Sequence, residues 1–361
     1  MQASQYFSED YAAARQNFLA AARVAGANIE SFENPCSGDT RFQLFTDVAL
    51  LGPADAGNCL VLISGTHGVE GFAGSAIQTG LLHGGSSVPI PLNTRVVMIH
   101  ALNPYGFANL RRCNEDNVDL NRNFIDHAGT YPENPGYVEL SDAIAPRVLS
   151  LQMNVLSQLS IFRYRLLRGR DMLQRAVTHG QYAYPQGLFY GGRFAVWSNR
   201  LLRDLLSRYH GHASRVIAID VHTGLGPFGR GELILNDAVE APAYQRAIDW
   251  WGKERVASTV DGHSVSAHLS GTINLALARM LPDAEVTAVG LEFGTLPPMA
   301  VFRALRAENW LYHHGGLQHP RAVEIKAKLL RAFYPDDPLW KHEVWEQGRR
   351  VVEQALSAAI R

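Results

Sequence analysis

The sequence predicts a three-layer α/β/α protein built around a central mixed, largely parallel sheet. Four short apolar runs rich in β-branched residues, bounded by Gly, Pro or Asn, are typical of buried strands: Cys59–Ser64, Thr94–His100, Arg215–Val221 and Thr287–Phe293. Helical patterns lie between these runs, and the alternation of strands with helices indicates layered α/β architecture.

The helices are predicted from apolar residues at helical spacing. They are Ser8–Gly26, with Ser8 as its N-cap, then Ala73–Leu82, Asn199–Tyr209, Ala241–Lys253 and Pro338–Ile360. No linker or repeat divides the chain, so we expect one domain over residues 1–361. Its long segment 125–214 is helix-prone and is interpreted as an insertion or cap.

Composition narrows the class of protein. The chain has 361 residues, 47% of them hydrophobic, and a net charge of -1, which argues against nucleic acid or an anionic membrane as an obligate partner. Three cysteines without C-x-x-C spacing fit reduced thiols. With no signal peptide pattern and no long apolar stretch, we expect a cytoplasmic protein and leave its oligomeric state open.

Three residues suggest a metal site. His67 and Glu70 form H-x-x-E in the glycine-flanked S-G-T-H-G-V-E-G, and His222 lies in I-D-V-H-T-G. A catalytic zinc takes three ligands from His and carboxylate and keeps a fourth position open. A single H-x-x-E often arises by chance, but both segments follow predicted strands, and ligands of open α/β sheets bind beyond the carboxyl ends of strands.

Two further segments carry candidate functional groups. The loop 103–124 concentrates arginines with Asn and Asp; its guanidinium groups are either solvated or available to a carboxylate or oxyanion. Glu292, between Leu291 and Phe293 on a predicted buried strand, is either half of a structural salt bridge or a general base.

Taken together, these motifs resemble those of the zinc metallocarboxypeptidase superfamily, which includes carboxypeptidase A-like peptidases and the succinylglutamate desuccinylase/aspartoacylase amidohydrolases. The resemblance rests on H-x-x-E, N-P-Y-G, D-L-N-R-N-F, the distal D-V-H-T-G and the strand-borne glutamate, in that order, over about Val61 to Thr295. It implies a zinc carboxypeptidase-like fold and one Zn²⁺ per chain.

The resemblance also implies roles for eight residues. His67, Glu70 and His222 would be the zinc ligands. Glu292 would be the catalytic glutamate, and Arg112 would stabilise the oxyanion. Asn121 and Arg122 would bind the substrate carboxylate, and Asp119 would orient the first zinc-binding histidine. Arg111 remains a rival for the oxyanion role. The substrate-binding tyrosine of the family has no motif here, because Tyr244, the only tyrosine in that interval, lies in a helical pattern.

The expected activity is a zinc metallopeptidase, carboxypeptidase-like, that hydrolyses a peptide or amide bond next to a free carboxylate in a small substrate. The alternative is an N-acyl amino acid amidohydrolase, and a binding protein without turnover is a third reading. A second metal is left open by His100, His263 and His268. In the insertion, the arginines between 163 and 175 are interpreted as a solvated helix face, and Tyr190 or Arg193 as candidates for a lid over the substrate.

Overall fold

The computed structural model describes residues 3–36, 43–260, 264 and 269–359. Its centre is an eight-stranded sheet with the order β1-β2-β4-β3-β5-β8-β6-β7. The strands are β1 (Asn28–Glu33), β2 (Phe45–Leu51), β3 (Asn58–Ile63), β4 (Thr94–His100), β5 (Arg215–Phe228), β6 (Gly231–Leu235), β7 (Val256–Ser258) and β8 (Glu285–Gly294). The inner strands β4, β3, β5 and β8 are parallel, whereas β1, β2 and β6 add antiparallel pairings. The predicted fold class is confirmed.

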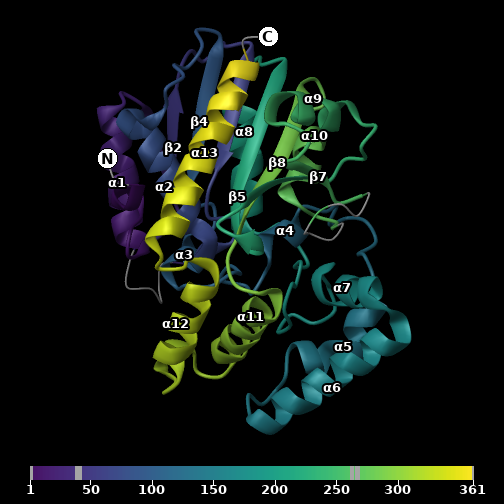
Figure 1. Cartoon of the computed structure of the whole chain (residues 1–361). Coiled ribbons are helices and arrows are strands. Elements are labelled where there is room, and N and C mark those ends of the chain that lie inside the picture. The colour runs from purple at the N-terminus through teal and green to yellow at the C-terminus, as the bar shows by residue number, and fades with distance from the viewer. Residues whose placement is uncertain (1–2, 37–42, 261–263, 265–268, 360–361) are drawn as a thin grey trace.

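Helices cover both faces of the sheet (Figure 1). Alternation along β3 sends Leu60 and Leu62 to one face and Val61 and Ile63 to the other. The first face packs against α1 (Tyr11–Val24), α2 (Gly71–Gly80), α9 (Pro242–Trp251) and α13 (Pro338–Ala358); the second packs against α8 (Trp197–Tyr209) and α10 (Ile273–Met280).

A third group of helices lies beyond the sheet, toward the bottom of Figure 1. It contains α5 (Pro135–Ile144), α6 (Leu151–Arg168) and α7 (Arg170–Thr178) from the insertion, together with α11 (Pro298–His313) and α12 (Ala322–Phe333). These helices share their own apolar cluster. The remaining short helical segments are η1 (Ala3–Tyr6), η3 (Gly68–Glu70), η4 (Leu81–Gly85), α3 (Pro104–Ala108), α4 (Leu120–Asn123) and η5 (Gly316–Gln318). The inserted helices therefore end before α8, because α8 packs against the second face of the sheet.

Two local predictions are corrected. Asp10, not Ser8, caps α1, because its side chain accepts the Ala13 N–H whereas the Ser8 hydroxyl accepts from Asn17. Strand β5 continues past Val221 to Phe228, so His222 lies within the strand and directly opposite Glu292 of β8. A shift in register after Thr223 lets the glycine-rich end of β5 remain paired.

Candidate metal centre

The candidate site lies where the order of the sheet reverses. β3 leads to β4 on one side, and the chain returns to place β5 on the other side of β3. Such a switch point, beyond the carboxyl ends of parallel strands, leaves room for a ligand. His67 follows β3 and is the N-cap residue of η3, which ends at Glu70.

Glycine makes this turn feasible. A Cβ on Gly68 would lie 1.9 Å from the backbone carbon of Gly106, so only glycine allows the turn to approach α3 this closely. The turn is also held from the other side, because the N–H groups of Gly68 and Val69 donate to the carbonyl oxygens of Arg112 and Arg111. These hydrogen bonds fix the position of the arginine loop relative to the H-x-x-E turn.

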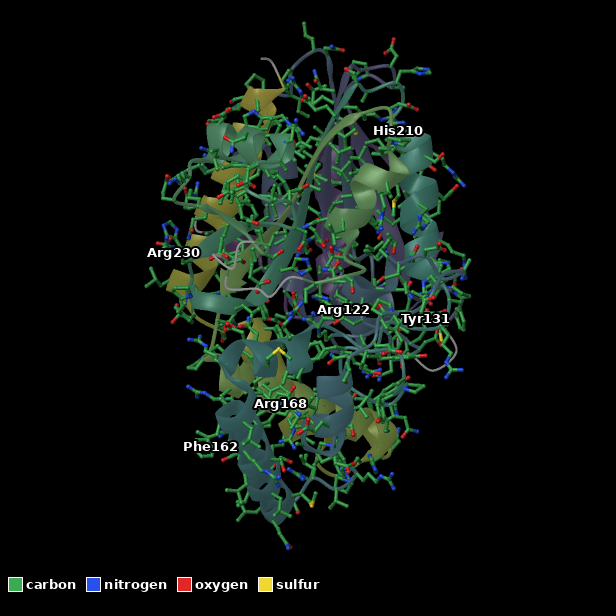
Figure 2. All side chains as sticks on the ribbon, turned by 90° about the vertical axis from the view of Figure 1, so that its right-hand side faces the viewer. Arg122, Tyr131, Phe162, Arg168, His210 and Arg230 are labelled. Carbon is green, nitrogen blue, oxygen red and sulfur yellow. The ribbon has the colours of Figure 1, made fainter. Side chains whose placement is uncertain are left out.

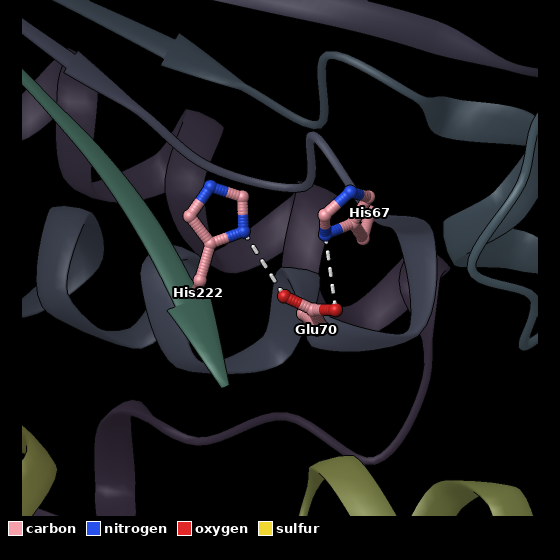
Figure 3. A group of neighbouring side chains, drawn as sticks. All are labelled: His67, Glu70 and His222. Atoms are coloured by element: carbon pink, nitrogen blue, oxygen red, sulfur yellow. Dashed lines mark hydrogen bonds and ion pairs between the residues drawn. The ribbon is translucent and has the colours of Figure 1, made fainter. Parts of the chain in front are cut away.

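The side chains of the three candidate ligands lie close together, as predicted. His67 Nδ1 lies 3.0 Å from Glu70 Oε1, and His222 Nδ1 lies 3.1 Å from Glu70 Oε2 (Figure 3). Their ligand atoms all lie within 4.8 Å of one another, and all three residues are buried. Within the described residues, this is the one group of His, Cys, Asp and Glu side chains with such a geometry.

Each histidine is oriented by a carboxylate on its far side. Asp119 Oδ1 lies 3.1 Å from His67 Nε2, and Asp220 Oδ2 lies 2.8 Å from His222 Nε2. Asp220 also accepts a hydrogen bond from the Thr66 hydroxyl. When the Nε2–H group donates a hydrogen bond to a carboxylate, Nδ1 carries a free lone pair, which is the arrangement that metal-binding histidines use.

The donor set fits a divalent cation such as zinc. Two imidazole nitrogens and one carboxylate form a known catalytic zinc set. His67 Nδ1 is buried and lies 3.0 Å from Glu70 Oε1, but the contact does not have the geometry of a hydrogen bond. A cation between them would satisfy both. These residues can therefore hold a metal.

Charged neighbours keep the acidic members ionised. Burial by itself raises the pKa of Glu70, but His67, His222 and Arg112 outweigh it and lower that pKa below its usual value. The pKa of Asp119 is likewise lowered, against the effect of burial, by Arg112 and Arg122. Deprotonated carboxylates are the form that metal coordination requires.

Glu292 differs from these acids. Burial, and then repulsion from Glu70, raises its pKa to about 7. Its Oε1 accepts the backbone N–H of Leu225 at 2.9 Å. Because Glu292 pairs in register with His222 on adjacent parallel strands, their side chains share one face of the sheet. The structure thus brings the predicted catalytic glutamate to the same edge as the three candidate ligands.

The two adjacent arginines have different surroundings. Arg112 donates from Nη1 to Glu70 Oε1 at 2.9 Å and from Nε to Asp119 Oδ2 at 3.0 Å. Arg111 instead donates to Glu308 and Asn117 in a separate buried cluster. Of the two, Arg112 is the one that contacts a candidate metal ligand, Glu70.

The predicted substrate pair lies beside the histidines but is covered. Asn121 Nδ2 is 3.3 Å from His222 Nε2. Arg122 is buried, and its Nη1 and Nη2 donate to the carbonyl oxygens of Asn121 and Thr178, the latter in the insertion. Its Nε is buried without a partner, and its Nη1 lies 4.0 Å from Asp119 Oδ1. Arg122 therefore shares its counter-charge, Asp119, with Arg112, which binds this carboxylate more closely at 3.0 Å.

Sequence reasoning missed two residues here. Asp220 lies two positions before His222 in D-x-H, a spacing that places both side chains on one face of a strand and could have identified it. Phe189, which has a positive φ of 55°, carries its ring 5.6 Å from the Arg112 guanidinium and 5.7 Å from that of Arg122. No periodicity marks Phe189, since it lies in a loop.

Other candidates from the sequence are placed elsewhere. His100 stacks on Phe18 and hydrogen-bonds to Ser75. His263 and His268 lie outside the described residues. Tyr244 is buried in α9, as expected from its helical pattern. The insertion arginines are all exposed, which agrees with a solvated helix face: Arg163, Arg165, Arg168, Arg170 and Arg175.

The proposed lid residues differ in exposure. Tyr190 is buried and its carbonyl oxygen accepts the N–H of Asp119, whereas Arg193 is exposed.

No helix within the described ranges has the length and apolar character needed to cross a lipid bilayer.

Comparison with known proteins finds distant similarity among solved structures and no match among curated proteins. Bovine thrombin-activatable fibrinolysis inhibitor is 10% identical, with a TM-score of 0.49 over 99% of both chains. Carboxypeptidase A from Helicoverpa armigera is 12% identical, with a TM-score of 0.47 over 91% of this chain and 75% of that one. Succinylglutamate desuccinylase from Chromobacterium violaceum is 16% identical, with a TM-score of 0.38 over 89% and 74%.

One family model covers nearly the whole chain. It is described as "Protein of unknown function (DUF2817)" and matches residues 7–347, from before α1 into α13. The chain belongs to the DUF2817 family.

Proposed function

We propose that this protein is a zinc-dependent hydrolase that cleaves a peptide or amide bond next to a free carboxylate. The observation that carries the proposal is the convergence of His67, Glu70 and His222, in which both Nδ1 atoms face one carboxylate while Asp119 and Asp220 hold the Nε2 atoms. A bound zinc ion would supply a Lewis acid and lower the pKa of its water toward neutrality.

Glu292 is the proposed general base and acid. A group with a pKa near the working pH can both accept and deliver a proton, and the pKa of Glu292 is raised to about 7. The Leu225 N–H holds Oε1 and leaves Oε2 to take a proton from the attacking water. Oε2 would then deliver this proton to the leaving amine.

Arginines are proposed to handle the negative charges of the reaction. Arg112 lies against Glu70 and would stabilise the oxyanion that develops on the scissile carbonyl. Arg122, a buried cation whose Nε has no partner and whose counter-charge Asp119 is shared with Arg112, would receive the substrate carboxylate together with Asn121 and so orient the substrate.

A second substrate class has support from the insertion. The Thr178 carbonyl and the Phe189 ring close over Arg122, which favours a small substrate over a long chain. An N-acyl amino acid has the same carboxylate and amide as a dipeptide but is otherwise compact. The test below therefore assays N-acyl amino acids as well as dipeptides.

The test combines metal analysis with activity. We expect about one zinc per purified chain, and hydrolysis of either dipeptides or N-acyl amino acids when both are assayed in parallel. Glu292→Gln should lower kcat by about 10²–10⁴-fold, since proton transfer is lost, while metal content stays unchanged. The matched control is Glu285→Gln at the exposed start of the same strand, which should retain activity.

Two results would reject the proposal. Full activity in Glu292→Gln would remove the glutamate from the mechanism. A metal-loaded protein that hydrolyses neither substrate class would instead favour a binding protein.

A further inference from the structure

The longest helix of the insertion, α6, lies at the bottom of Figure 1. It carries an exposed apolar stripe. Its members are spaced by four, four, three and four residues and are 50–83% exposed: Leu151, Val155, Leu159, Phe162 and Leu166. At 3.6 residues per turn they fall within an arc of about 80°. Figure 2 shows Phe162 at the outer edge of the molecule. Isolated exposed apolar residues are ordinary, but a contiguous row marks an interaction surface.

The orientation of α6 is set by its opposite face. Of its 18 residues only Ser157 and Tyr164 are buried. Arg306 of α11 donates from Nη2 to the Ser157 hydroxyl and from Nη1 to Asn154 Oδ1. Because these contacts hold the inner face of α6 against the body, the stripe remains outside and the chain's own core does not use it.

The charges on α6 are unevenly distributed along its length. The helix has no Asp or Glu, and its arginines, Arg163, Arg165 and Arg168, all lie in the C-terminal half. By helical spacing, Arg163 borders the stripe on one side and Arg165 borders it on the other. The N-terminal half is bordered instead by the uncharged Gln152 and Gln158.

This pattern is complementary to itself when reversed. In an antiparallel pair, Leu151 lies opposite Leu166, Val155 lies opposite Phe162, and Leu159 lies near the two-fold axis. Each basic half then faces an uncharged half, whereas a parallel pair would place guanidinium groups against one another. A two-fold interface needs such a self-complementary surface, in which residue i contacts j and j contacts i.

We propose that the α6 stripe binds the α6 stripe of a second copy of this chain, forming an antiparallel, two-fold symmetric dimer. Five side chains from each copy form a small contact compared with stable specific interfaces, which bury about 1,200–2,000 Å² in total. The dimer is therefore reversible, and its population depends on protein concentration. The candidate metal centre lies at the sheet edge and is not part of this contact.

Sedimentation velocity over a range of concentrations tests the dimer. The wild-type mass should rise from one chain toward two, and Leu159→Glu should weaken association at least about tenfold, because it brings two carboxylates together at the axis. The matched control is Val323→Glu on α12, an equally apolar helical position that is 83% exposed and lies off the stripe. It should dimerise like the wild type.

Two results of this experiment overturn the proposal. One is a wild-type protein that remains monomeric at every concentration, including one that instead pellets with phosphatidylserine vesicles. The other is a dimer that persists undiminished in Leu159→Glu.

Disulfide cross-linking tests the orientation without any need to disrupt the interface. In a Cys36→Ser background, which removes the exposed native thiol, Leu159→Cys should cross-link under mild oxidation with diamide. Leu151→Cys should not, because antiparallel packing separates its two copies by roughly 20 Å along the helix at 1.5 Å per residue. Cross-linking of Leu151→Cys as readily as Leu159→Cys would indicate a parallel pair and overturn the proposal.

Discussion

Arg111 and Arg112 are neighbours in sequence, yet their side chains enter two different buried clusters. Arg111 donates to Glu308, which also accepts from Lys326, and its guanidinium lies 3.3 Å from the centre of the Tyr312 ring. Arg112 enters the group that contains Glu70. We refer to these as the Arg111 cluster and the Arg112 cluster.

The clusters differ in how their polar atoms are satisfied. In the Arg111 cluster, one carboxylate is matched by two cations, and Arg111 also donates to the Asn114 carbonyl oxygen and to Asn117 Oδ1, although Asn114 Nδ2 is buried without a partner. In the Arg112 cluster, two histidines face one carboxylate, and His67 Nδ1 has no hydrogen-bond partner. Matched buried charges hold the fold together, whereas two imidazole nitrogens that face one carboxylate are suited to a metal ion.

The largest expected effect is the loss of metal from the Arg112 cluster. His67→Ala removes the nitrogen without a partner and should weaken metal binding well over about 100-fold, since even outer supports of a metal site contribute 10–100-fold. Elemental analysis after dialysis checks this. The Arg111 cluster is untouched, so the urea midpoint of the metal-free protein should stay close to wild type. Stoichiometric metal in His67→Ala would exclude this residue as a ligand.

The Arg111 cluster should instead determine stability. Glu308→Gln leaves the buried Arg111 without its counter-charge and should lower the free energy of unfolding by about 3–5 kcal/mol, measured by urea denaturation. The control is Glu324→Gln, which breaks an exposed pair with Lys328 on α12 and should cost less than about 1 kcal/mol. Loss of metal at unchanged stability in Glu308→Gln would reverse the assignment of the two clusters.

His100 lies outside both clusters and serves as a reference for a buried histidine. Its Nε2 is hydrogen-bonded to the Ser75 hydroxyl and not to a carboxylate. Burial lowers its pKa from 6.5 to about 4. The unfolded state therefore binds more protons between these values, and stability present above pH 6.5 is lost as the pH falls toward 4. The contribution is on the order of 3 kcal/mol.

The measurement is the pH dependence of unfolding free energy in wild type and His100→Asn. The variant should lack this part of the slope between pH 6.5 and 4. Identical slopes for the two proteins would show that His100 is not held in its neutral form.

The smallest effect concerns the support of His222. Asp220→Asn keeps the shape but removes the charge that holds Nε2, and should weaken metal binding about 10–100-fold. Competition with a chelator measures the affinity. Asp116→Asn, at an exposed position in the arginine loop, is the control and should bind metal normally. An unchanged affinity in Asp220→Asn would show that His222 does not need this carboxylate.

The parts of the fold found from sequence are those with a strong local pattern. The buried strands β3, β4 and β8 were located within two residues of their ends, because apolar runs mark strands covered on both faces. Strands β1, β2, β6 and β7 were missed: β1 is half exposed, β6 and β7 have only five and three residues, and the buried β2 carries Asp47 within its apolar run. The end of β5 was missed because T-G-L-G-P is typical of a loop, and pairing with β8 decides otherwise.

The candidate site was predictable to the same degree. His67, Glu70 and His222 carry recognisable spacing and directly follow the predicted strands, and the structure brings them together. Phe189 could not be found, because it approaches Arg112 and Arg122 only through the path of the insertion. The covering of Arg122 by Thr178 was equally unpredictable, since the two residues lie 56 positions apart.

The sequence alone determined the layered α/β architecture and the identity of three candidate metal ligands, because hydrophobic periodicity and short motifs are local properties of the chain. It did not separate Arg111 from Arg112. Only the tertiary structure decided that one guanidinium meets Glu308 and the other Glu70, because partners 197 and 42 positions away are chosen by packing. The same packing leaves the α6 stripe exposed.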